Sequence, residues 1–430
     1  METKLNRIAE LSSINANEVF TSIYHLLNKE LLMQCHQEQD KNKAKGIDGI
    51  SKEDYEQNLD ENLDNLVLRL KNKSYKPLPT LRKYIPKGNG KQRPLGIASY
   101  EDKIVQKALK KLIEAIYEPR FLDCMYGFRP NRGCHDALKS LNWIIESKKI
   151  NYVLDADIKG FFENIDHEWL MKCLETKIKD KNILGLVKKY LKAGLMEDNV
   201  YSATEVGTAQ GSNLSPVLAN IYMHYVLTLW FYKDVRKEMK GESYLIVYAD
   251  DFVCCFQYKK EAEEFYRMLQ ERLRRFGLEL EKSKNRLINF GRFANEDNKP
   301  DKPETFDFLG FTHYCGVSKN GKFRVKRKTS KKKYGEKVKK FEQWMKENRI
   351  QPLKTIIPKV NKKLVGHYNY YGITDNSPMI AKYYQKVIQI MFKWLNRRSQ
   401  KASYTWEGFN EMLKYYPLVR ASIRVNIYEK

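Results

Sequence analysis

The sequence of 430 residues lacks any unbroken apolar run of the ~18 residues that a membrane-spanning helix requires. Its first residues, METKLNRIAELSS, contain two glutamates and no apolar core segment, unlike a signal peptide or an acid-poor transit peptide. Neither a membrane partner nor a cleaved targeting segment is therefore expected.

Cysteine is sparse, and the seven cysteines include no Cys-x-x-Cys pair. Disulfide frameworks and zinc knuckles use paired spacings, so no structural zinc is expected and a reducing cytoplasm is indicated. Cys254 and Cys255 lie in an apolar segment, where we expect them to pack rather than react. The seven histidines are scattered without a pair at ligand spacing, and none follows His367.

Acidic residues are few compared with basic ones, since 53 Asp and Glu stand against 78 Lys and Arg and the formal net charge is +25. A large positive charge implies an anionic partner. Basic residues mixed with 12% aromatic residues suit nucleic acid, whose phosphates pair with cations and whose bases stack on rings. Charge alone is a loose signal, so a generally basic protein without such a partner is the alternative.

The chain is too long for one ordinary core, so two or three lobes are expected. The spacing of apolar residues predicts helices in much of residues 1–75 and over 102–117, 168–195, 217–231 and 261–276. It predicts a hairpin over 81–97 with its tip at Gly88–Gly90, a strand over 152–158, and a buried hairpin over 244–256 with an acidic tip.

Two adjacent acids, Asp250 and Asp251, interrupt this apolar hairpin, and Asp157 lies near the end of another apolar strand. Partly buried carboxylates that repel one another are stabilised by a divalent cation. A two-metal site needs such oxygen ligands from separate segments, with the ions about 3.5–4 Å apart. The alternative for Asp250 and Asp251 is a solvated turn.

Three cations could complete a site for a nucleoside triphosphate. Lys87 and Arg93 lie on the glycine-tipped hairpin, which could fold over a substrate as a lid, and Lys284 follows the predicted helix at 261–276. An ordinary basic hairpin is the alternative. A second basic region contains twelve Lys or Arg and one acid between Lys319 and Lys340, which places a lobe boundary near Val317. The alternative for this run is a solvated face or a flexible tail.

Seven segments of the chain form a set: YADD at 248–251, DIKGFFENIDH at 157–167, YGFRPNR at 126–132, IPKGNGKQRPLGI at 85–97, FDFLGF at 306–311, GIDG at 46–49 and GHYNYY at 366–371. Together they resemble the bacterial group II intron reverse transcriptase/maturases. The match runs in order from about residue 40 to 410, and the set is far more specific than YADD alone.

The resemblance implies an α+β fold of the right-hand polymerase type, with fingers, a palm built on an antiparallel sheet, and a helical thumb. The implied divisions are a helical N-terminal extension at 1–75, fingers and palm at 76–316, a basic thumb or maturase domain at 317–400, and a short C-terminal segment at 401–430 that could bind DNA. In that segment and just before it, Arg397, Arg398 and Lys401 could touch DNA.

The resemblance also implies the site. Asp157, Asp250 and Asp251 would be catalytic and, with Ile158, would bind two Mg²⁺ ions, for which Mn²⁺ can substitute. The nucleotide would contact Lys87, Arg93, Phe162, Gln210, Gly211 and Lys284, with Phe162 excluding a ribose 2′-hydroxyl. The alternative for Phe162 is plain packing in the core, which is expected of Phe161. Nucleic acid would contact Arg129, Lys326, Arg327, Lys328, Lys331, Lys332 and Lys333.

By the same resemblance the chain is expected to be an RNA-directed DNA polymerase that uses deoxynucleoside triphosphates, an RNA/DNA primer–template and a structured RNA, namely group II intron RNA. It would assist splicing and mobility within a cytoplasmic bacterial ribonucleoprotein. Two departures stand out: Ser212 replaces a glycine after Gln210-Gly211, which can alter the flexibility of that loop, and the ligands of a C-terminal His/Cys endonuclease are missing. The alternatives are an RNA-binding splicing factor with a vestigial polymerase, and a domesticated enzyme of DNA repair or phage defence.

Overall fold

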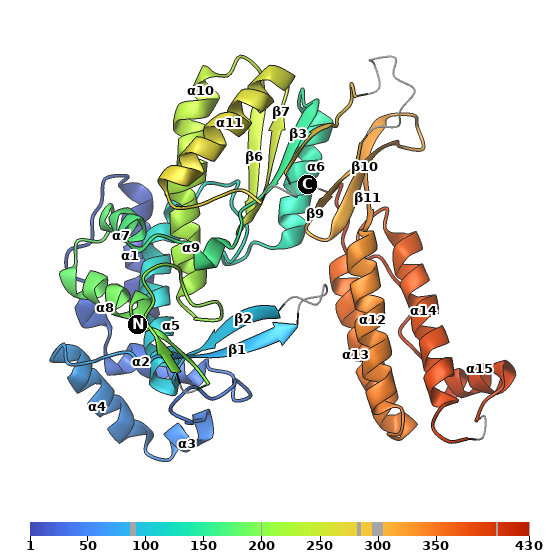
Figure 1. The fold of residues 1–430 in the computed structure, drawn as a ribbon, viewed down its shortest axis with the longest axis horizontal. Helices are drawn as coiled ribbons and strands as arrows, with labels where there is room; N and C mark the ends of the chain where they lie inside the picture. Colours follow the sequence, from blue (N-terminus) through green and yellow to red (C-terminus); the bar gives the residue numbers. More distant parts are fainter. Residues whose placement is uncertain (87–91, 199, 282–284, 295–303, 401–402, 430) are drawn as a thin grey trace.

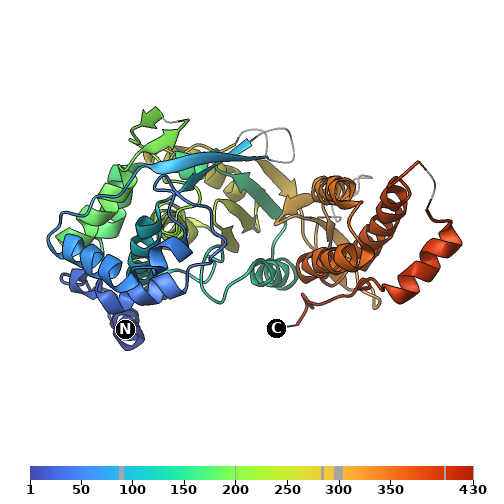
Figure 2. The same ribbon diagram turned by 90° about the horizontal axis from the view of Figure 1, so that it is seen from below.

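The computed structural model describes residues 1–86, 92–198, 200–281, 285–294, 304–400 and 403–429 (Figure 1). The chain begins with a helical region at one end of the molecule, and its C-terminal helices lie at the other end (Figures 1 and 2). The first helices are α1 (Glu2–Ile14), η1 (Tyr24–Leu26), α2 (Lys29–Gln37), α3 (Lys52–Glu56) and α4 (Leu59–Lys71). The mainly helical character expected for residues 1–75 is therefore confirmed.

A four-stranded sheet follows, with strand order β2-β1-β4-β5. Its strands are β1 (Thr80–Pro86), β2 (Gln92–Ile97), β4 (Leu195–Glu197) and β5 (Val200–Ser202). β1 and β2 form the antiparallel hairpin that the sequence predicts, and β1 pairs in parallel with β4. In Figure 1 this hairpin extends from the N-terminal half toward the C-terminal helices. The expected tip at Gly88–Gly90 lies outside the described residues.

The central sheet is antiparallel and has the order β6-β7-β3-β8. Its strands are β3 (Tyr152–Asp157), β6 (Ser243–Tyr248), β7 (Asp251–Phe256) and β8 (Arg286–Asn289). Side chains alternate between its two faces, so Cys254 and Cys255 point in opposite directions. Both are fully buried, which confirms the expectation that they pack.

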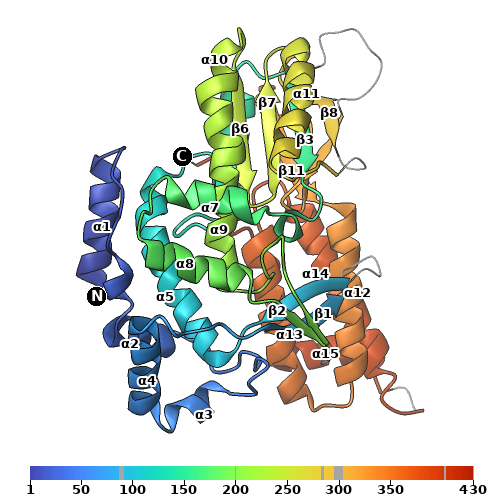
Figure 3. The same cartoon turned by 60° about the vertical axis from the view of Figure 1, so that its left-hand side comes forward.

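Each face of the central sheet belongs to a different core. Leu154, Phe252 and Cys254 pack with helices of the N-terminal half, whereas Val153 and Val253 pack with the C-terminal region. α11 runs along this sheet (Figure 3). The helices of this half are α5 (Tyr100–Tyr117), η2 (Glu118–Arg120), α6 (Cys134–Ser147), η3 (Phe161–Glu163), α7 (His167–Glu175), α8 (Lys181–Leu191), α9 (Ser215–Met223), η4 (His224–Thr228), η5 (Phe231–Val235), α10 (Arg236–Glu238) and α11 (Lys259–Arg275).

One expected helix is divided. The apolar pattern over 168–195 gives two helices, α7 and α8, and then the strand β4. Asp180 starts α8, because its carboxylate accepts hydrogen bonds from the backbone N–H groups of Asn182 and Ile183. The other oxygen of Asp180 accepts from the N–H groups of Ile23 and Tyr24 at 2.8 Å. The break is thus fixed by an aspartate that also holds the N-terminal region.

The C-terminal region combines a small sheet with four helices. The sheet has the order β11-β10-β9, with β9 (Phe306–Phe308), β10 (Phe311–Val317) and β11 (Phe323–Thr329). The helices are α12 (Lys331–Asn348), α13 (Leu353–Tyr371), α14 (Ser377–Leu395) and α15 (Trp406–Tyr415). Val317, where a lobe boundary is expected, ends β10, and the basic residues that suggested it begin at Lys319 in the turn and continue along β11.

The last residues return to this sheet. Val425 forms a bridge with Ile373, and the Tyr428 hydroxyl donates to the carboxylate of Asp375 at 2.6 Å. The Arg398 guanidinium donates to the carbonyl oxygens of Arg349 and Gln351, so it ties together the ends of helices. Arg397 is exposed, and Lys401 lies outside the described residues. Within the described part of the chain, no helix combines the length and the apolar character needed to cross a membrane.

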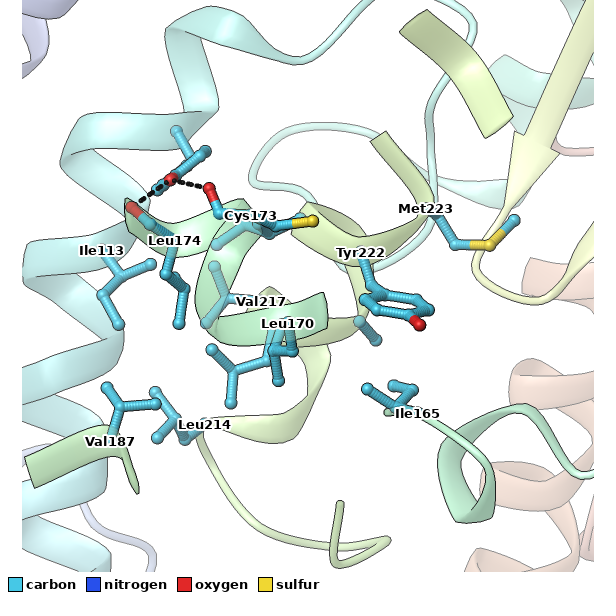
Figure 4. Close-up of a cluster of buried hydrophobic side chains, with 14 of the residues drawn as sticks. Ile113, Ile165, Leu170, Cys173, Leu174, Val187, Leu214, Val217, Tyr222 and Met223 are labelled. Atoms are coloured by element: carbon cyan, nitrogen blue, oxygen red, sulfur yellow. Dashed lines mark hydrogen bonds between the residues drawn. The ribbon is translucent and has the colours of Figure 1, made fainter. Parts of the chain in front are cut away.

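A buried tyrosine joins α5 to α7. The Tyr117 hydroxyl donates to the carbonyl oxygens of Cys173 and Leu174, at 3.0 Å in each case. The surrounding apolar side chains come from α5, α7, α8, α9 and the segments between the last three helices (Figure 4).

Tyr117→Phe should lower the free energy of unfolding by about 1 kcal/mol, because it removes this hydroxyl while both carbonyls keep their backbone hydrogen bonds. Urea unfolding followed by circular dichroism measures the change. Tyr415→Phe, at a position that is 82% exposed, is the matched control and should leave the midpoint unchanged. An unchanged midpoint for Tyr117→Phe would contradict a stabilising role for the hydroxyl.

Candidate active site

A two-residue turn connects β6 to β7 and carries the acidic pair. Tyr248 pairs with Asp251 across the hairpin, so Ala249 and Asp250 form the turn. Ala249 has a φ of 59°, the left-handed region that such a turn requires at its first central position. A residue with a Cβ enters this region only at a cost, and such strain is typically kept at functional sites. We call residues 248–251 the acidic turn.

Asp157 lies directly opposite Asp251 in the antiparallel pair of β3 and β7. Opposed residues project from the same face of a sheet with their Cβ atoms about 5 Å apart. Asp250 precedes Asp251 in the turn, so the structure brings the three aspartates to one end of the central sheet. All three are half-buried.

These carboxylates suit a divalent cation, since hard oxygens held close together repel one another until a cation lies between them. Ile158, which is 2% exposed, could offer only its backbone carbonyl oxygen. Among the described residues, no three His, Cys, Asp or Glu side chains are arranged to hold an ion by themselves. Mg²⁺ usually takes one or two carboxylates and completes its shell with water and substrate phosphate. The donor set therefore fits an ion whose coordination a bound triphosphate completes.

Residues 124–129 dock against the acidic turn, and we call them the docking loop. The Tyr126 N–H donates to the Val247 carbonyl at 2.9 Å, and the Val247 N–H donates to the Cys124 carbonyl at 2.8 Å. A Cβ on Gly127 would lie 2.4 Å from the backbone nitrogen of Ala249, so only glycine fits there. The Asn220 side chain of α9 donates to the Gly127 carbonyl at 2.8 Å. The backbone of the docking loop thus packs against the acidic turn.

Arg129 anchors the docking loop, which corrects the expectation that it binds nucleic acid. Its guanidinium is buried and donates to the Glu118 carboxylate at 2.8–2.9 Å and to the carbonyl oxygens of Leu122 and Met125 at 2.9 and 3.0 Å. The guanidinium also lies over the Phe121 ring. Because these contacts bury the cation, it is not exposed to a phosphate.

Phe162 lies in η3, five residues after Asp157. Phe161 is 1% exposed, which confirms its expected place in the core, while Phe162 is half-buried. The Phe162 ring meets the Phe128 ring of the docking loop edge to face, with 6.1 Å between ring centroids. Two segments that are distant in the sequence thus form an aromatic pair near the three aspartates.

The loop that carries Gln210 and Gly211 links the Phe162 segment to β2. The Thr208 N–H donates to the Phe162 carbonyl at 2.7 Å, and the Gly96 N–H of β2 donates to the Gln210 carbonyl at 2.6 Å. Gly211 has a φ of 105°, and a Cβ there would lie 2.9 Å from the Gly96 carbonyl oxygen. The β1–β2 hairpin is therefore fastened to the loop by backbone contacts.

Ser212 has a defined role in this loop. Its hydroxyl donates to the side-chain oxygen of Gln106 on α5 at 2.9 Å and accepts from the Leu214 N–H at 3.1 Å. The serine thus adds a side-chain hydrogen bond between the loop and α5, beside those that Asn213 makes to Gln106 and Lys103. A cavity of about 230 Å³ lies beside this loop, and its lining includes Arg82 of β1, Gly96 of β2 and Gln210 of the loop itself.

Of the three cations expected to contact the nucleotide, only Arg93 lies among the described residues. Arg93 lies on β2 opposite Ile85, and its side chain is exposed. Lys87 and Lys284 lie outside the described residues.

The basic residues of the C-terminal region do not all face solvent. Arg327 is fully buried and donates to the Asn142 side chain of α6, which corrects the expectation that it contacts nucleic acid. Alternation along β11 turns Val325, Arg327 and Thr329 inward and leaves Lys326 and Lys328 toward solvent. β11 was not predicted from the sequence, because a cation occupies one of its inward positions, where an apolar residue is expected.

Lys331, Lys332 and Lys333 form the first turn of α12. The N-terminus of a helix carries partial positive charge, which repels cations. Lys333 is compensated by Glu336 at 3.2 Å, whereas Lys331 and Lys332 are exposed. Ser330 caps the helix by accepting from the Lys333 N–H. This position suits a phosphate group.

Sequence reasoning left the individual roles of Gly127, Phe128 and Asn220 unassigned. The motif at 126–132 contains the first two, but their contacts with the acidic turn and with Phe162 arise only in the folded chain. Asn220, 3% exposed in the apolar helix α9, had a usable signal, because a buried amide in an apolar helix needs hydrogen-bond partners.

Gly127→Ala should displace the acidic turn, because the added methyl group would overlap the backbone of Ala249. We expect a loss of about 1–3 kcal/mol in stability from the overpacking, with metal-dependent chemistry impaired more strongly than folding. Thermal unfolding and activity measured on the same samples check this. Gly185→Ala, at a helix position with nothing within 4 Å of the added Cβ, is the control and should leave activity unchanged. Equal behaviour of the two variants would contradict the close packing.

Arg129→Ala should destabilise the protein by about 3 kcal/mol, because it leaves Glu118 and two carbonyl groups without the buried guanidinium. Arg132→Ala removes an ion pair with Asp123, whose side chain is 94% exposed, and should cost less than about 1 kcal/mol. Unfolding midpoints of the two variants test the difference. A similar small loss in both would contradict the anchoring role of Arg129.

Comparison with known proteins agrees with the geometry. Residues 85–313, more than half of the chain, match the family model described as reverse transcriptase (RNA-dependent DNA polymerase). The chain is 35% identical to the group II intron-encoded protein LtrA of Lactococcus lactis subsp. cremoris over 315 residues, covering 68% of this chain and 50% of LtrA. It is 36% identical to the protein YkfC of Escherichia coli (strain K12) over 182 residues, covering 42% and 48%. The chain thus spans about half the length of these relatives.

A solved structure of telomerase from Candida albicans with a telomeric RNA fragment aligns with a TM-score of 0.44 and 12% sequence identity, covering 79% of this chain and 61% of that chain. The match of the family model, together with three aspartates at one end of an antiparallel sheet, establishes the assignment: the chain belongs to the reverse transcriptase (RNA-dependent DNA polymerase) family.

Proposed function

We propose that this protein extends a primer along an RNA template, using deoxynucleoside triphosphates and two divalent metal ions. The observation that carries the proposal is the pairing of Asp157 with Asp251 of the acidic turn. Reverse transcriptases generally use divalent metal ions, and Mg²⁺ is the ion that carboxylates and a triphosphate bind together most readily; Mn²⁺ can substitute.

The proposed reaction forms a bond between the primer 3′-oxygen and the α-phosphorus and breaks the bond from that phosphorus to pyrophosphate. Asp157, Asp250 and Asp251 hold the ions, with the Ile158 carbonyl as a further donor. When bound, the ions lower the pKa of the 3′-hydroxyl and neutralise charge on the leaving group. Arg93, with Lys87 and Lys284, pairs with the triphosphate.

Phe162 excludes a ribose 2′-hydroxyl by steric contact, because its ring follows Asp157 by five residues and is only half-buried. Gln210 and Gly211 line the nucleotide pocket, which the hydrogen bond from Gly96 to the Gln210 carbonyl supports. In this proposal residues 1–75 form an N-terminal extension and 76–316 form the fingers and palm. Residues 317–400 form a thumb, and 401–430 form a short segment that could bind DNA.

Structured RNA is the proposed partner of the C-terminal region. Lys326 and Lys328 on β11 and Lys331, Lys332 and Lys333 on α12 gather cations at the strand-to-helix junction, and the helix N-terminus adds positive partial charge. Similarity to LtrA, whose name describes a group II intron-encoded protein, supports intron RNA as that partner and a role in splicing and mobility within a ribonucleoprotein.

Asp250→Ala should reduce primer extension on an RNA template by about a thousandfold or more, equivalent to about 4 kcal/mol of transition-state stabilisation. RNA affinity should remain, because the acidic turn lies on the central sheet and not among the proposed RNA-binding lysines. Extension with and without Mg²⁺, alongside filter binding of the same RNA, measures both quantities. The exposed Asp123→Ala is the control and should extend normally.

The outcome separates three functions. If the unchanged protein does not extend a primer in Mg²⁺, the function that remains is that of an RNA-binding splicing factor with a vestigial polymerase. Undiminished extension by Asp250→Ala would refute the assigned site. A domesticated enzyme of DNA repair or phage defence would share the activity, and intron RNA domains flanking the gene would argue against it.

Replacing Lys331, Lys332 and Lys333 together by Gln should weaken RNA binding and lower the slope of log affinity against log salt, by about one for each phosphate that the protein no longer neutralises. Extension of a preformed primer–template at saturating concentration should change less than affinity. Replacing Lys259, Lys260 and Arg267 on α11 by Gln removes the same charge from another exposed helix and should leave the slope unchanged. Equal effects of the two triple variants would indicate only a reduction of general charge.

A further inference from the structure

The docking loop holds one large apolar side chain in a conformation that such residues rarely adopt. Phe128 has a φ of 59°, and its side chain is 47% exposed. Neither feature is favourable: the left-handed region strains a residue with a bulky side chain, and an exposed ring gains little from burial. Strain of this kind persists only where the surrounding structure enforces it.

The neighbours of Phe128 fix its backbone on both sides. Gly127 packs against the backbone of Ala249 in the acidic turn, and its carbonyl accepts from Asn220. Arg129 is buried by its hydrogen bonds to Glu118 and to backbone carbonyls. With both flanking residues anchored, Phe128 cannot relax its φ without releasing the loop from the turn.

The enforced conformation directs the Phe128 ring to Phe162. The two rings meet edge to face at 6.1 Å, a favoured arrangement for aromatic pairs. Phe161, fully in the core, meets Phe162 at 5.5 Å, and the Phe162 carbonyl accepts from the Thr208 N–H. Phe162 therefore has its backbone fixed, one neighbouring ring in the core, and Phe128 as its contact from the docking loop.

We propose that Phe128 is a specificity-determining residue, which positions the Phe162 ring and thereby sets the preference for deoxyribonucleotides over ribonucleotides. This inference rests on the proposed exclusion of a 2′-hydroxyl by Phe162. Phe162 can exclude a 2′-hydroxyl by steric contact only if its ring keeps its position. A ring that can change rotamer can turn away from the added hydroxyl. Phe128 acts through Phe162 and does not itself touch the sugar.

The test measures kcat/KM for a deoxynucleoside triphosphate and for the matching ribonucleoside triphosphate, each incorporated once on an RNA template. Phe128→Ala should lower the ratio of the two values by about threefold to tenfold, the size expected for the removal of one aromatic pair. The change should come mainly from faster use of the ribonucleotide. Phe162→Ala should lower the ratio further.

The double variant Phe128→Ala/Phe162→Ala shows whether Phe128 changes the sugar preference through Phe162. Because Phe128 acts through Phe162, the double variant should have the same ratio as Phe162→Ala alone. A further reduction that equals the effect of Phe128→Ala by itself would overturn the positioning role.

Phe128→Asn distinguishes the loss of the ring from a general folding defect, because asparagine tolerates a positive φ and lacks the ring. Its melting temperature should equal or exceed that of the unchanged protein, while its sugar preference should fall as in Phe128→Ala. Trp143→Ala, on α6 and also 47% exposed, is the matched control and should keep the ratio unchanged. A Phe128→Asn variant that keeps the ratio would overturn the inference.

The failures are distinguishable. If Phe162→Ala loses the preference while both Phe128 variants keep it, this inference alone is wrong. If Phe162→Ala keeps the preference, the proposed role of Phe162 fails and this inference fails with it. If the unchanged protein extends no primer, the proposed function itself fails.

Discussion

The antiparallel pairing of β3 with β7 places Asp157 opposite Asp251, and the rest of the site is arranged around this pair. Like charges directly opposed across strands destabilise a sheet, and a shift of one residue would turn Asp157 to the other face. The register is held by apolar neighbours on both faces, such as Val153 with Cys255 and Leu154 with Cys254, which are almost completely buried. Hydrophobic burial within the sheet thus opposes the repulsion at its end.

Around that pair the site is assembled mainly by backbone contacts. Gly127 lies against the acidic turn and Gly211 lies against β2, in both cases where a Cβ would leave no room. Carbonyl and N–H groups join the Gln210 loop to the Phe162 segment and to the β1–β2 hairpin. Backbone N–H and carbonyl groups therefore hold together segments that are far apart in the sequence. Side chains that these contacts do not use can meet a substrate.

Much of this arrangement follows from sequence patterns. Alternation and turn residues locate the strands that carry Asp157 and Asp251, and the apolar runs around them predict that both strands are buried. The pattern does not reveal which strands are neighbours, because β3 meets β7 through long-range pairing that no local preference specifies. The inward position of Arg327 and the division of 168–195 were missed for a related reason. In each case one polar residue, Arg327 or Asp180, is satisfied by partners distant in the sequence.

One core is shared by the central sheet and the C-terminal region. Val153, Val253 and Ile288 belong to the same buried cluster as Phe311 of β10 and Tyr368 of α13. Leu138 and Leu141 of α6 belong to it as well, so α6 and the C-terminal region together cover this face of the sheet. A destabilising change in α13 would be felt at the strands that hold the aspartates. Deletion of the region proposed to bind RNA would therefore expose part of the core that supports the palm strands.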